Sequence, residues 1–377
     1  MIVLEQGPSG VPALFAQPQA RIVAWQPEQV AQALNDMAAA QAAGFWLAGY
    51  ASYELGYALE PRLQHLMPEP SVRRVPLLAF EVHAEPVSAV PLLAQWDTLA
   101  AYAQLTPWVP DWSAERYRIA FDTLRQWIAQ GDCYQANLTF ALRAHTTASA
   151  QNLYAQLRRQ QAVPYGAFLD MGVGPVVLSR SPELFFRVDA SGTIEACPMK
   201  GTMPRQSDVA QDAAIAQALH HSAKNRAENI MIVDLLRNDI GRLCEVGSVH
   251  VPELFKVQTY ATVHQMVSRV VGQLRPGIGL QALFQALFPC GSVTGAPKIR
   301  AMEIIRALES EARGVYCGSI GWIAPDGAAE MSVAIRTLSL FEGGEVVLNV
   351  GGGVVFDSTA DHEYEEALWK ARFAQPA

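Results

Sequence analysis

Apolar residues recur at helical spacing in several parts of the chain. Between residues 113 and 130 they fall at Tyr117, Ala120, Leu124 and Ile128, and Gly131 follows as a stop signal. The same spacing predicts further helices over residues 208–237, 280–287, 297–308 and 362–373.

Short runs rich in β-branched and aromatic residues predict strands between these helices. The first group covers residues 176–179, 184–188 and 193–197, with a turn at 189–192. The second covers residues 315–355, where Pro325-Asp-Gly327 is typical of a hairpin turn. Helices and hairpins come in blocks without the steady alternation of a parallel sheet, which predicts an α+β fold.

The chain divides into two regions at a proline-containing segment. Residues 106–112 read as a linker, because their two prolines resist regular structure. We expect an N-terminal region over residues 1–108 and a second region over residues 113–373, interleaved in one globule.

Composition narrows the classes of partner. The net charge of −8 over 377 residues gives no electrostatic reason to expect nucleic acid or an anionic membrane. The N-terminus lacks the pattern of a signal peptide, and no apolar run approaches the roughly 20 residues needed to cross a bilayer. The five cysteines are scattered without a C-x-x-C pair, which favours reduced thiols in the cytoplasm.

Carboxylates on predicted helices form the first candidate site. Glu363 and Glu366 share a helix face, with Lys370 one turn further on, and Glu228 lies on another helical stretch. Such carboxylates can supply oxygen ligands to Mg²⁺. From spacing alone, solvated helix faces are the simpler interpretation.

Other candidates lie at glycine-rich segments. Lys200 stands beside a glycine at the end of a strand run, where a partly apolar site can convert lysine into a nucleophile. The triplet at residues 351–353 offers amides at a turn that can bind a carboxylate. Residues 291–298 fail the phosphate-loop spacing and read as a strand-to-helix turn. Taken singly, a solvated lysine and tight glycine turns remain open as alternatives.

Taken together, six segments resemble the chorismate-binding enzyme family, which includes anthranilate, aminodeoxychorismate, isochorismate and salicylate synthases. They occur in the family's order and are Gly131-Asp-Cys-Tyr-Gln-Ala-Asn-Leu138, Ser181-Pro-Glu183, Pro198-Met-Lys-Gly-Thr202, the segment 227–239, Thr294-Gly-Ala-Pro-Lys-Ile-Arg-Ala-Met302 and Gly351-Gly-Gly-Val-Val-Phe-Asp-Ser358. The resemblance implies two facing antiparallel sheets flanked by helices, as in anthranilate synthase component I.

The resemblance also implies roles for individual residues. It makes Glu228 and Glu366 Mg²⁺ ligands, with Glu363 helping through water, while Asn225 stands where relatives often have an acid. It implies that chorismate contacts Gln135, Ser292, Thr294, Tyr316, Arg336, Gly351, Gly353 and Lys370. Either His264 or Gln265 takes the place of a histidine found in anthranilate synthases.

Two positions favour one branch of the family. Gln135 replaces the lysine base of the water-adding members, and Lys200 replaces the alanine that anthranilate synthases carry. Lysine at that position resembles aminodeoxychorismate synthase component I. The implied activity is Mg²⁺-dependent amination of chorismate to 4-amino-4-deoxychorismate for p-aminobenzoate and folate synthesis, with Lys200 as nucleophile and Glu183 as general acid.

No cysteine lies in a G-x-C-x-G elbow, so ammonia is expected from a separate glutamine amidotransferase subunit. Two alternatives remain at this stage: anthranilate synthase component I, and an inactive protein that only binds chorismate or a partner.

Overall fold

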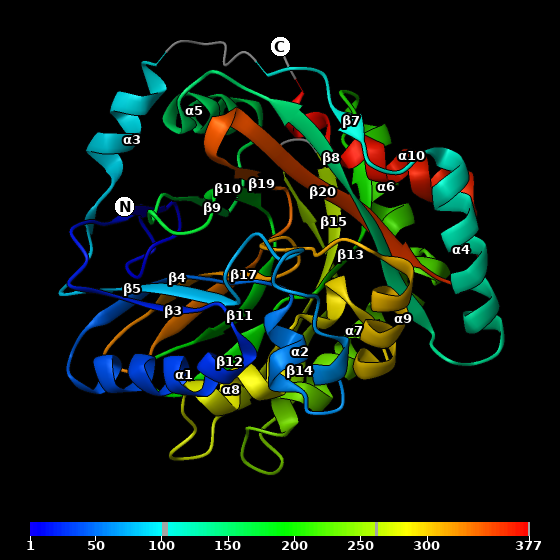
Figure 1. Ribbon diagram of the computed structural model, residues 1–377. Coiled ribbons are helices and arrows are strands. Elements are labelled where there is room, and N and C mark those ends of the chain that lie inside the picture. The colour runs from blue at the N-terminus through cyan, green and yellow to red at the C-terminus, as the bar shows by residue number, and fades with distance from the viewer. Residues whose placement is uncertain (100–104, 261–262, 376–377) are drawn as a thin grey trace.

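The computed structural model describes residues 1–99, 105–260 and 263–375, and two antiparallel sheets dominate it (Figure 1). One sheet follows the order β16-β8-β20-β19-β10-β9-β1-β2-β6, with β7 paired to β8. Its strands are β1 (Ile2–Leu4), β2 (Ala13–Phe15), β6 (Val87–Ser88), β7 (Val109–Pro110), β8 (Gln135–His145), β9 (Tyr165–Leu169), β10 (Val176–Ser181), β16 (Gly295–Ala296), β19 (Thr337–Leu340) and β20 (Glu345–Val354).

The other sheet follows the order β13-β15-β12-β11-β18-β17-β4-β5-β3, with β14 paired to β15. Its strands are β3 (Ala20–Ala24), β4 (Trp46–Ala51), β5 (Leu78–His83), β11 (Leu184–Val188), β12 (Thr193–Ala196), β13 (Met199–Pro204), β14 (His250–Thr259), β15 (Val263–Gln273), β17 (Ser319–Ile323) and β18 (Ala329–Val333). Strands from residues 1–88 therefore extend both sheets, and the division of the chain at residues 108–113 stays a prediction.

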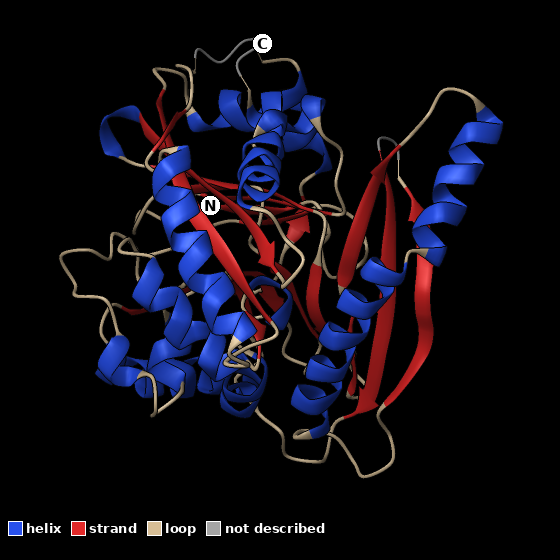
Figure 2. Ribbon diagram, turned by 90° about the vertical axis from the view of Figure 1, so that its right-hand side faces the viewer, coloured by secondary structure: helices blue, strands red, loops and turns tan. Residues whose placement is uncertain are grey.

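Helices surround the strands (Figure 2). Helices α4, α5, α9 and α10 pack on the first sheet, and α1, α6 and α7 pack on the second. The helices are α1 (Pro27–Ala42), α2 (Leu55–Leu59), α3 (Val90–Asp97), α4 (Ala114–Ala129), α5 (Ala150–Gln160), α6 (Val209–His221), α7 (Ala223–Gly241), α8 (Leu280–Leu287), α9 (Lys298–Leu308) and α10 (Ala360–Lys370); short 3₁₀ turns are η1 (Gln64–Leu66), η2 (Gly291–Val293), η3 (Glu342–Gly344) and η4 (Arg372–Ala374). The predicted α+β sandwich is confirmed.

Helix α4 shows how local sequence produces these elements. The Ser113 side chain accepts a hydrogen bond from the amide of Arg116 and so caps the first turn. Tyr117 and Leu124 are buried on one face, and Gly131 ends the run with φ +84°. The helix predicted between residues 113 and 130 is confirmed.

Three predictions from local pattern are wrong. The helix expected over residues 208–237 is divided at Ser222, whose extended backbone and side chain cap α7. The expected linker contains β7, because Val109 and Pro110 pair with the edge of β8. The glycine triplet lies inside β20 rather than at a turn, where Gly351 pairs with Thr139 and Gly353 with Asn137.

Glycine is required at position 351 by the closeness of the neighbouring strand. A Cβ atom there would lie 2.3 Å from the carbonyl oxygen of Leu138. Helix α1 was not predicted, although its buried residues Val30, Ala33, Leu34 and Met37 follow helical spacing.

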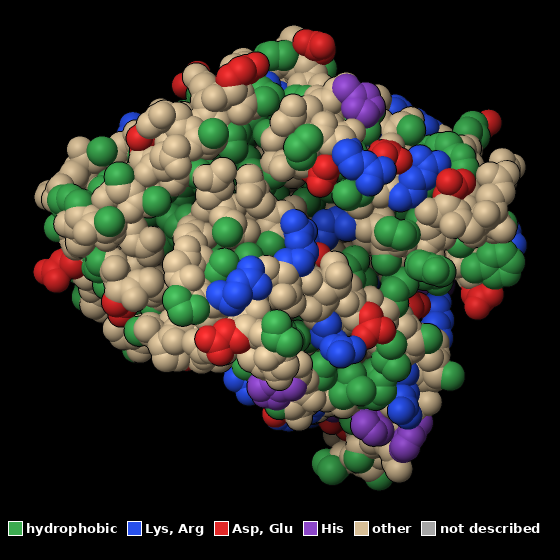
Figure 3. Space-filling view, turned by 90° about the horizontal axis from the view of Figure 1, so that it is seen from below, with side chains coloured by type: hydrophobic (Ala, Val, Ile, Leu, Met, Phe, Trp, Pro, Cys, Tyr) green, Lys and Arg blue, Asp and Glu red, His purple; other side chains and the backbone are tan. Residues whose placement is uncertain are grey.

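The surface of the protein carries charged side chains of both signs, as its composition leads us to expect. The face seen from below in Figure 3 carries basic and acidic side chains interspersed with apolar ones. Among the described residues, no helix is long and apolar enough to span a membrane.

Candidate functional site

Lys200 and Glu183 come from neighbouring parts of the second sheet. Lys200 lies on β13 and is half-buried, and Glu183 lies just before β11 and is 5% exposed. The Oε1 atom of Glu183 is buried without a hydrogen-bond partner among the described residues. A buried carboxyl oxygen without a protein partner is available to form a hydrogen bond with a ligand.

Burial shifts the pKa values of these two groups in opposite directions. It raises the pKa of Glu183 to about 7, opposed by a hydrogen bond with Ser292 and by the charge of Lys200. It lowers the pKa of Lys200, and the positive charge of Lys370 acts in the same direction while Glu228 and Glu183 oppose it. Near neutral pH this arrangement favours a protonated carboxyl and a neutral amine more than water does.

The turn at η2 and the start of β8 form another side of the site. Ser292 and Thr294 are both buried, and the amide of Asn137 donates to the carbonyl of Thr294 at 2.8 Å. Gln135 is fully buried; its Nε2 donates to Asn137 Oδ1 at 3.3 Å, and its Oε1 has no partner among the described residues. The fold therefore brings together the three predicted contacts Gln135, Ser292 and Thr294.

Tyr316 and Arg336 lie next to positions with unusual backbone geometry. Cys317, directly after Tyr316, has φ +63°, and Arg336 itself has φ +52°. Non-glycine residues in this region are held there by their surroundings and cluster at functional sites. Within the described chain, no hydrogen bond or ion pair satisfies the Arg336 guanidinium, and burial lowers its pKa. A partly desolvated cation of this kind suits a carboxylate ligand.

A cavity of about 60 Å³ borders Tyr316 on the side of Asn349 and Thr337. It includes neither Lys200 nor Glu183 in its lining, so we place the reactive groups outside it.

The glycine strand faces helix α10. The Nζ atom of Lys370 donates to the carbonyl oxygen of Gly351 at 2.8 Å and lies 2.9 Å from Glu366 Oε1. A Cβ at position 352 would lie 3.0 Å from Glu363 Oε2. Gly351, Gly352 and Lys370 therefore lie beside the carboxylates of α10, whereas a Cβ at position 353 would lie 2.8 Å from Gln135 Nε2.

The predicted metal ligands lie on two helices, Glu228 on α7 and Glu363 and Glu366 on α10. Lys224, one turn before Glu228 on α7, is close enough to Glu363 and Glu366 for its charge to favour their ionised forms, so this end of α7 lies toward α10. Glu363 accepts a hydrogen bond from Ser358, and burial and the charge of Glu366 raise its pKa. Among the described residues no three acidic, histidine or cysteine side chains are close enough to form a metal site. The donor set still fits Mg²⁺, which needs only one or two protein carboxylates and retains water.

Strand alternation turns the side chains of His264 and Gln265 to opposite faces of the second sheet. His264 turns toward α6, where its Nε2 lies 2.8 Å from Asp212 Oδ1 and its Nδ1 lies 3.0 Å from Thr259. Gln265 pairs with Thr202 of β13, and its side chain points to the opposite face of the sheet. Asn225 bonds Ser222 and lies against Gly201.

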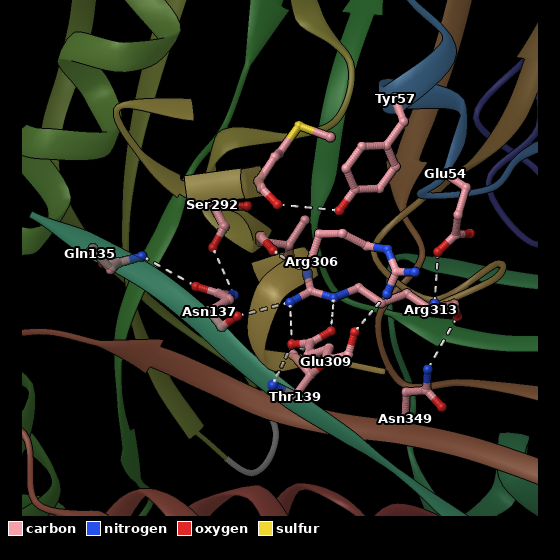
Figure 4. Close-up of polar contacts among 12 residues, drawn as sticks. Glu54, Tyr57, Gln135, Asn137, Thr139, Ser292, Arg306, Glu309, Arg313 and Asn349 are labelled. Carbon is pink, nitrogen blue, oxygen red and sulfur yellow. Dashed lines mark hydrogen bonds and ion pairs between the residues drawn. The ribbon is translucent and has the colours of Figure 1, made fainter. Parts of the chain in front are cut away.

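Sequence reasoning missed a buried polar network behind the site (Figure 4). Its centre is the ion pair between Glu309 and Arg313, which are each 5% exposed. In the sequence both residues look like solvated charges of a loop, and only the position of Arg313 just before Tyr316 hints at more.

Comparison with known proteins agrees with the family resemblance of the six sequence segments. The chain matches the chorismate binding enzyme family over residues 1–376. It is 44% identical over 280 residues to aminodeoxychorismate synthase component 1 of Klebsiella aerogenes, covering 74% of this chain and 61% of that one. It is 46% identical over 260 residues to aminodeoxychorismate synthase of Streptomyces pristinaespiralis, covering 69% of this chain and 36% of that one. The chain thus spans less than two thirds of the length of these relatives.

A solved structure supports the fold. Anthranilate synthase component I from Streptococcus pneumoniae superposes with a TM-score of 0.80 at 24% identity, covering 96% of this chain and 92% of that one.

Proposed function

The chain belongs to the chorismate-binding enzyme family, and we propose that it aminates chorismate to 4-amino-4-deoxychorismate. The observation that carries this proposal is the opposed pKa shift of Lys200 and Glu183. The names of the relatives from Klebsiella aerogenes and Streptomyces pristinaespiralis support the same branch.

The reaction begins with substrate binding. Arg336 and Tyr316 contact a substrate carboxylate, with Gln135, Ser292, Thr294 and the strand of Gly351 and Gly353 around the ring. Glu228 and Glu366 would hold Mg²⁺, and Glu363 would assist through water. Bound Mg²⁺ supplies Lewis-acid stabilisation of the ring carboxylate.

Covalent catalysis follows from the two shifted groups. The neutral Nζ of Lys200 attacks C2 of chorismate, both ring double bonds shift, and the C4 hydroxyl leaves as water after Glu183 gives it a proton. Ammonia then attacks C4, the double bonds shift back and the amine of Lys200 leaves. The net change is chorismate plus ammonia to 4-amino-4-deoxychorismate plus water.

We assign the supply of ammonia to a separate glutamine amidotransferase subunit. Burial raises the pKa of all five cysteine thiols, to about 11 for Cys133, Cys197 and Cys244 and about 12 for Cys290 and Cys317. A nucleophilic cysteine needs the opposite shift, so none of these thiols is suited to hydrolyse glutamine.

Product analysis tests the proposal. With chorismate, Mg²⁺ and ammonium at alkaline pH, liquid chromatography with mass spectrometry should find 4-amino-4-deoxychorismate, and glutamine should not replace ammonium. Anthranilate as the main product, or efficient glutamine use by the purified chain alone, would contradict it.

A further inference from the structure

The buried ion pair of Glu309 and Arg313 connects three segments that carry proposed substrate contacts. The Arg313 guanidinium donates from Nε and Nη2 to the two carboxylate oxygens of Glu309, at 2.8 and 2.7 Å. Its Nη1 donates to the carbonyl of Val293 at 3.0 Å, and its Nη2 also donates to the carbonyl of Asn137 at 2.8 Å. These four hydrogen bonds use four of the five N–H donors of the side chain.

The carbonyl partners of Arg313 belong to the site. Val293 lies between Ser292 and Thr294, and Asn137 lies two residues after Gln135 and bonds it through its side chain. The Asn137 Nδ2 also donates to the carbonyl of Ser292 at 3.4 Å. Arg313 therefore holds the η2 turn against the start of β8 (Figure 4).

Glu309 attaches this pair to the sheet. Its Oε1 accepts hydrogen bonds from the amide and the hydroxyl of Thr139, at 2.9 and 3.0 Å. Thr139 pairs with Gly351 of β20, so the same carboxylate fixes the strand that carries the glycine contacts.

The N-terminal region fixes the backbone of Arg313 itself. Glu54, which is 2% exposed, accepts hydrogen bonds from the amides of Arg313 and Gly314, at 2.7 and 3.0 Å. Asn349 donates to the carbonyl of Arg313 at 3.1 Å. These contacts hold the Arg313–Gly314 peptide, two to three residues before Tyr316, between β20 and the N-terminal region.

We propose that Arg313 is a positioning residue for chorismate, because it sets the η2 turn, β8 and the approach to Tyr316 relative to one another. The inference rests on the proposed function for the identity of the substrate. Arg313 touches no reacting atom in this scheme. Its loss therefore loosens the geometry that binds chorismate, whereas Glu183 is connected to Arg313 only indirectly, through its hydrogen bond with Ser292 of the η2 turn.

The variant Arg313→Lys tests this role. Lysine keeps the charge but concentrates its donors at one point, so it cannot reach Glu309 and both carbonyls together. We expect the chorismate KM and the chorismate Kd with Mg²⁺ to rise about tenfold, as expected for the loss of one or two charge-assisted hydrogen bonds. The turnover number and the KM for ammonium should change less, by about threefold at most, because Arg313 reaches Glu183 only through Ser292.

Arg73 provides a matched control. It is 6% exposed, and its guanidinium donates to the carbonyls of Pro68 and Trp25 and to the side chain of Gln26, none of which belongs to the site. Arg73→Lys should lower the unfolding temperature comparably and leave the chorismate Kd unchanged. An unchanged Kd in Arg313→Lys, or the same rise in Arg73→Lys, overturns the proposal.

A second variant covers the case in which Arg313→Lys does not fold. Thr139→Val removes one hydrogen bond to Glu309, and we expect the chorismate Kd to rise about threefold; an unchanged Kd overturns the proposal. If the proposed function is wrong, the wild type will form a different product from chorismate. If only the role of Arg313 is wrong, the product will be as proposed but the chorismate Kd of the variant will equal that of the wild type.

Discussion

The network of Arg313 and the pair of Lys200 and Glu183 both keep charged groups away from water, but they differ in how those groups are satisfied. Arg313 donates four hydrogen bonds, and Glu309 accepts from Thr139 as well as from Arg313. Within the described chain, one oxygen of Glu183 has no partner, and the Lys200 amine makes no hydrogen bond and has only charged neighbours.

The protonation states differ accordingly. The charge of Glu309 keeps the pKa of Arg313 above its usual value despite burial, whereas burial dominates at Lys200 and Glu183. A satisfied buried charge stabilises one geometry, and an unsatisfied one changes its protonation and becomes reactive. We therefore expect the satisfied pair of Glu309 and Arg313 to stabilise the fold, and Lys200 and Glu183 to carry the proposed chemistry.

The largest expected effect follows from removing Lys200. Lys200→Ala should lower amination by roughly 10³-fold or more, because loss of a covalent nucleophile leaves only direct attack by ammonia. Mass spectrometry of the wild type with chorismate and Mg²⁺ but no ammonia should find an adduct of dehydrated chorismate on Lys200.

The adduct should be absent in Lys200→Ala and present in Lys256→Ala, which removes an exposed lysine paired with Glu253. Full synthesis of 4-amino-4-deoxychorismate by Lys200→Ala would show that Lys200 is not the nucleophile. The contrast between a reactive pair and the structural network of Arg313 would then be lost.

Replacing Glu183 should have the next largest effect. Glu183→Gln should lower kcat/KM by about 10²–10³-fold, since it removes the general acid. In the wild type, kcat/KM should fall as pH rises above about 7, because Glu183 must hold its proton. It should also fall toward acidic pH as Lys200 gains a proton.

The profile must be measured at a constant concentration of free ammonia, because ammonia also titrates. The residual activity of Glu183→Gln should lack the alkaline decline. A decline that persists in the variant would assign it to another group.

Removing a carboxylate of the proposed metal site should change the Mg²⁺ requirement. Glu228→Gln should raise the Mg²⁺ concentration for half-maximal activity by about 100-fold. Mutating residues that only hydrogen-bond a metal ligand already costs about 10–100-fold in metal affinity, so loss of a direct ligand should reach at least the upper end of that range. Glu245→Gln, on an exposed position after α7, is the matched control. Equal Mg²⁺ dependence in Glu228→Gln and the wild type would exclude Glu228 as a ligand.

Stability measurements give the most direct contrast between the two regions. Arg313→Met should lower the free energy of unfolding by about 3–5 kcal/mol, because it leaves Glu309 buried without its partner. Glu183→Gln should raise it at pH 8 by about 1–3 kcal/mol, because ionising this carboxyl in the folded protein is unfavourable.

The sign follows from the raised pKa of Glu183. As pH rises from 4.5 to about 7, the unfolded chain releases the proton before the folded protein does, so the wild type loses stability over that interval. Urea denaturation at pH 5 and pH 8 should therefore show a larger gain for Glu183→Gln at pH 8. Equal gains at both values would show that Glu183 ionises freely in the folded protein.

Sequence alone predicted the elements whose signals are local. Helix α4 follows from apolar spacing and the cap at Ser113, and the hairpin at Pro325-Asp-Gly327 follows from turn chemistry; there the amide of Ala324 bonds the carbonyl of Ala328. The family's segments also identified Lys200, Glu183 and the carboxylates of α10 as candidates. Local signals failed at Ser222 and in the glycine triplet, where capping and strand pairing decided the outcome.

Only the tertiary structure decided which charges are satisfied. Thr139 and Glu309 are 170 residues apart, and Glu54 and Arg313 are 259 residues apart. The partner of a charge and its distance from water depend on such long-range contacts, so a sequence cannot distinguish a solvated arginine from Arg313. The same reason applies to Lys200 and Glu183, because a pKa is set by the burial and the neighbouring charges that folding brings to the group.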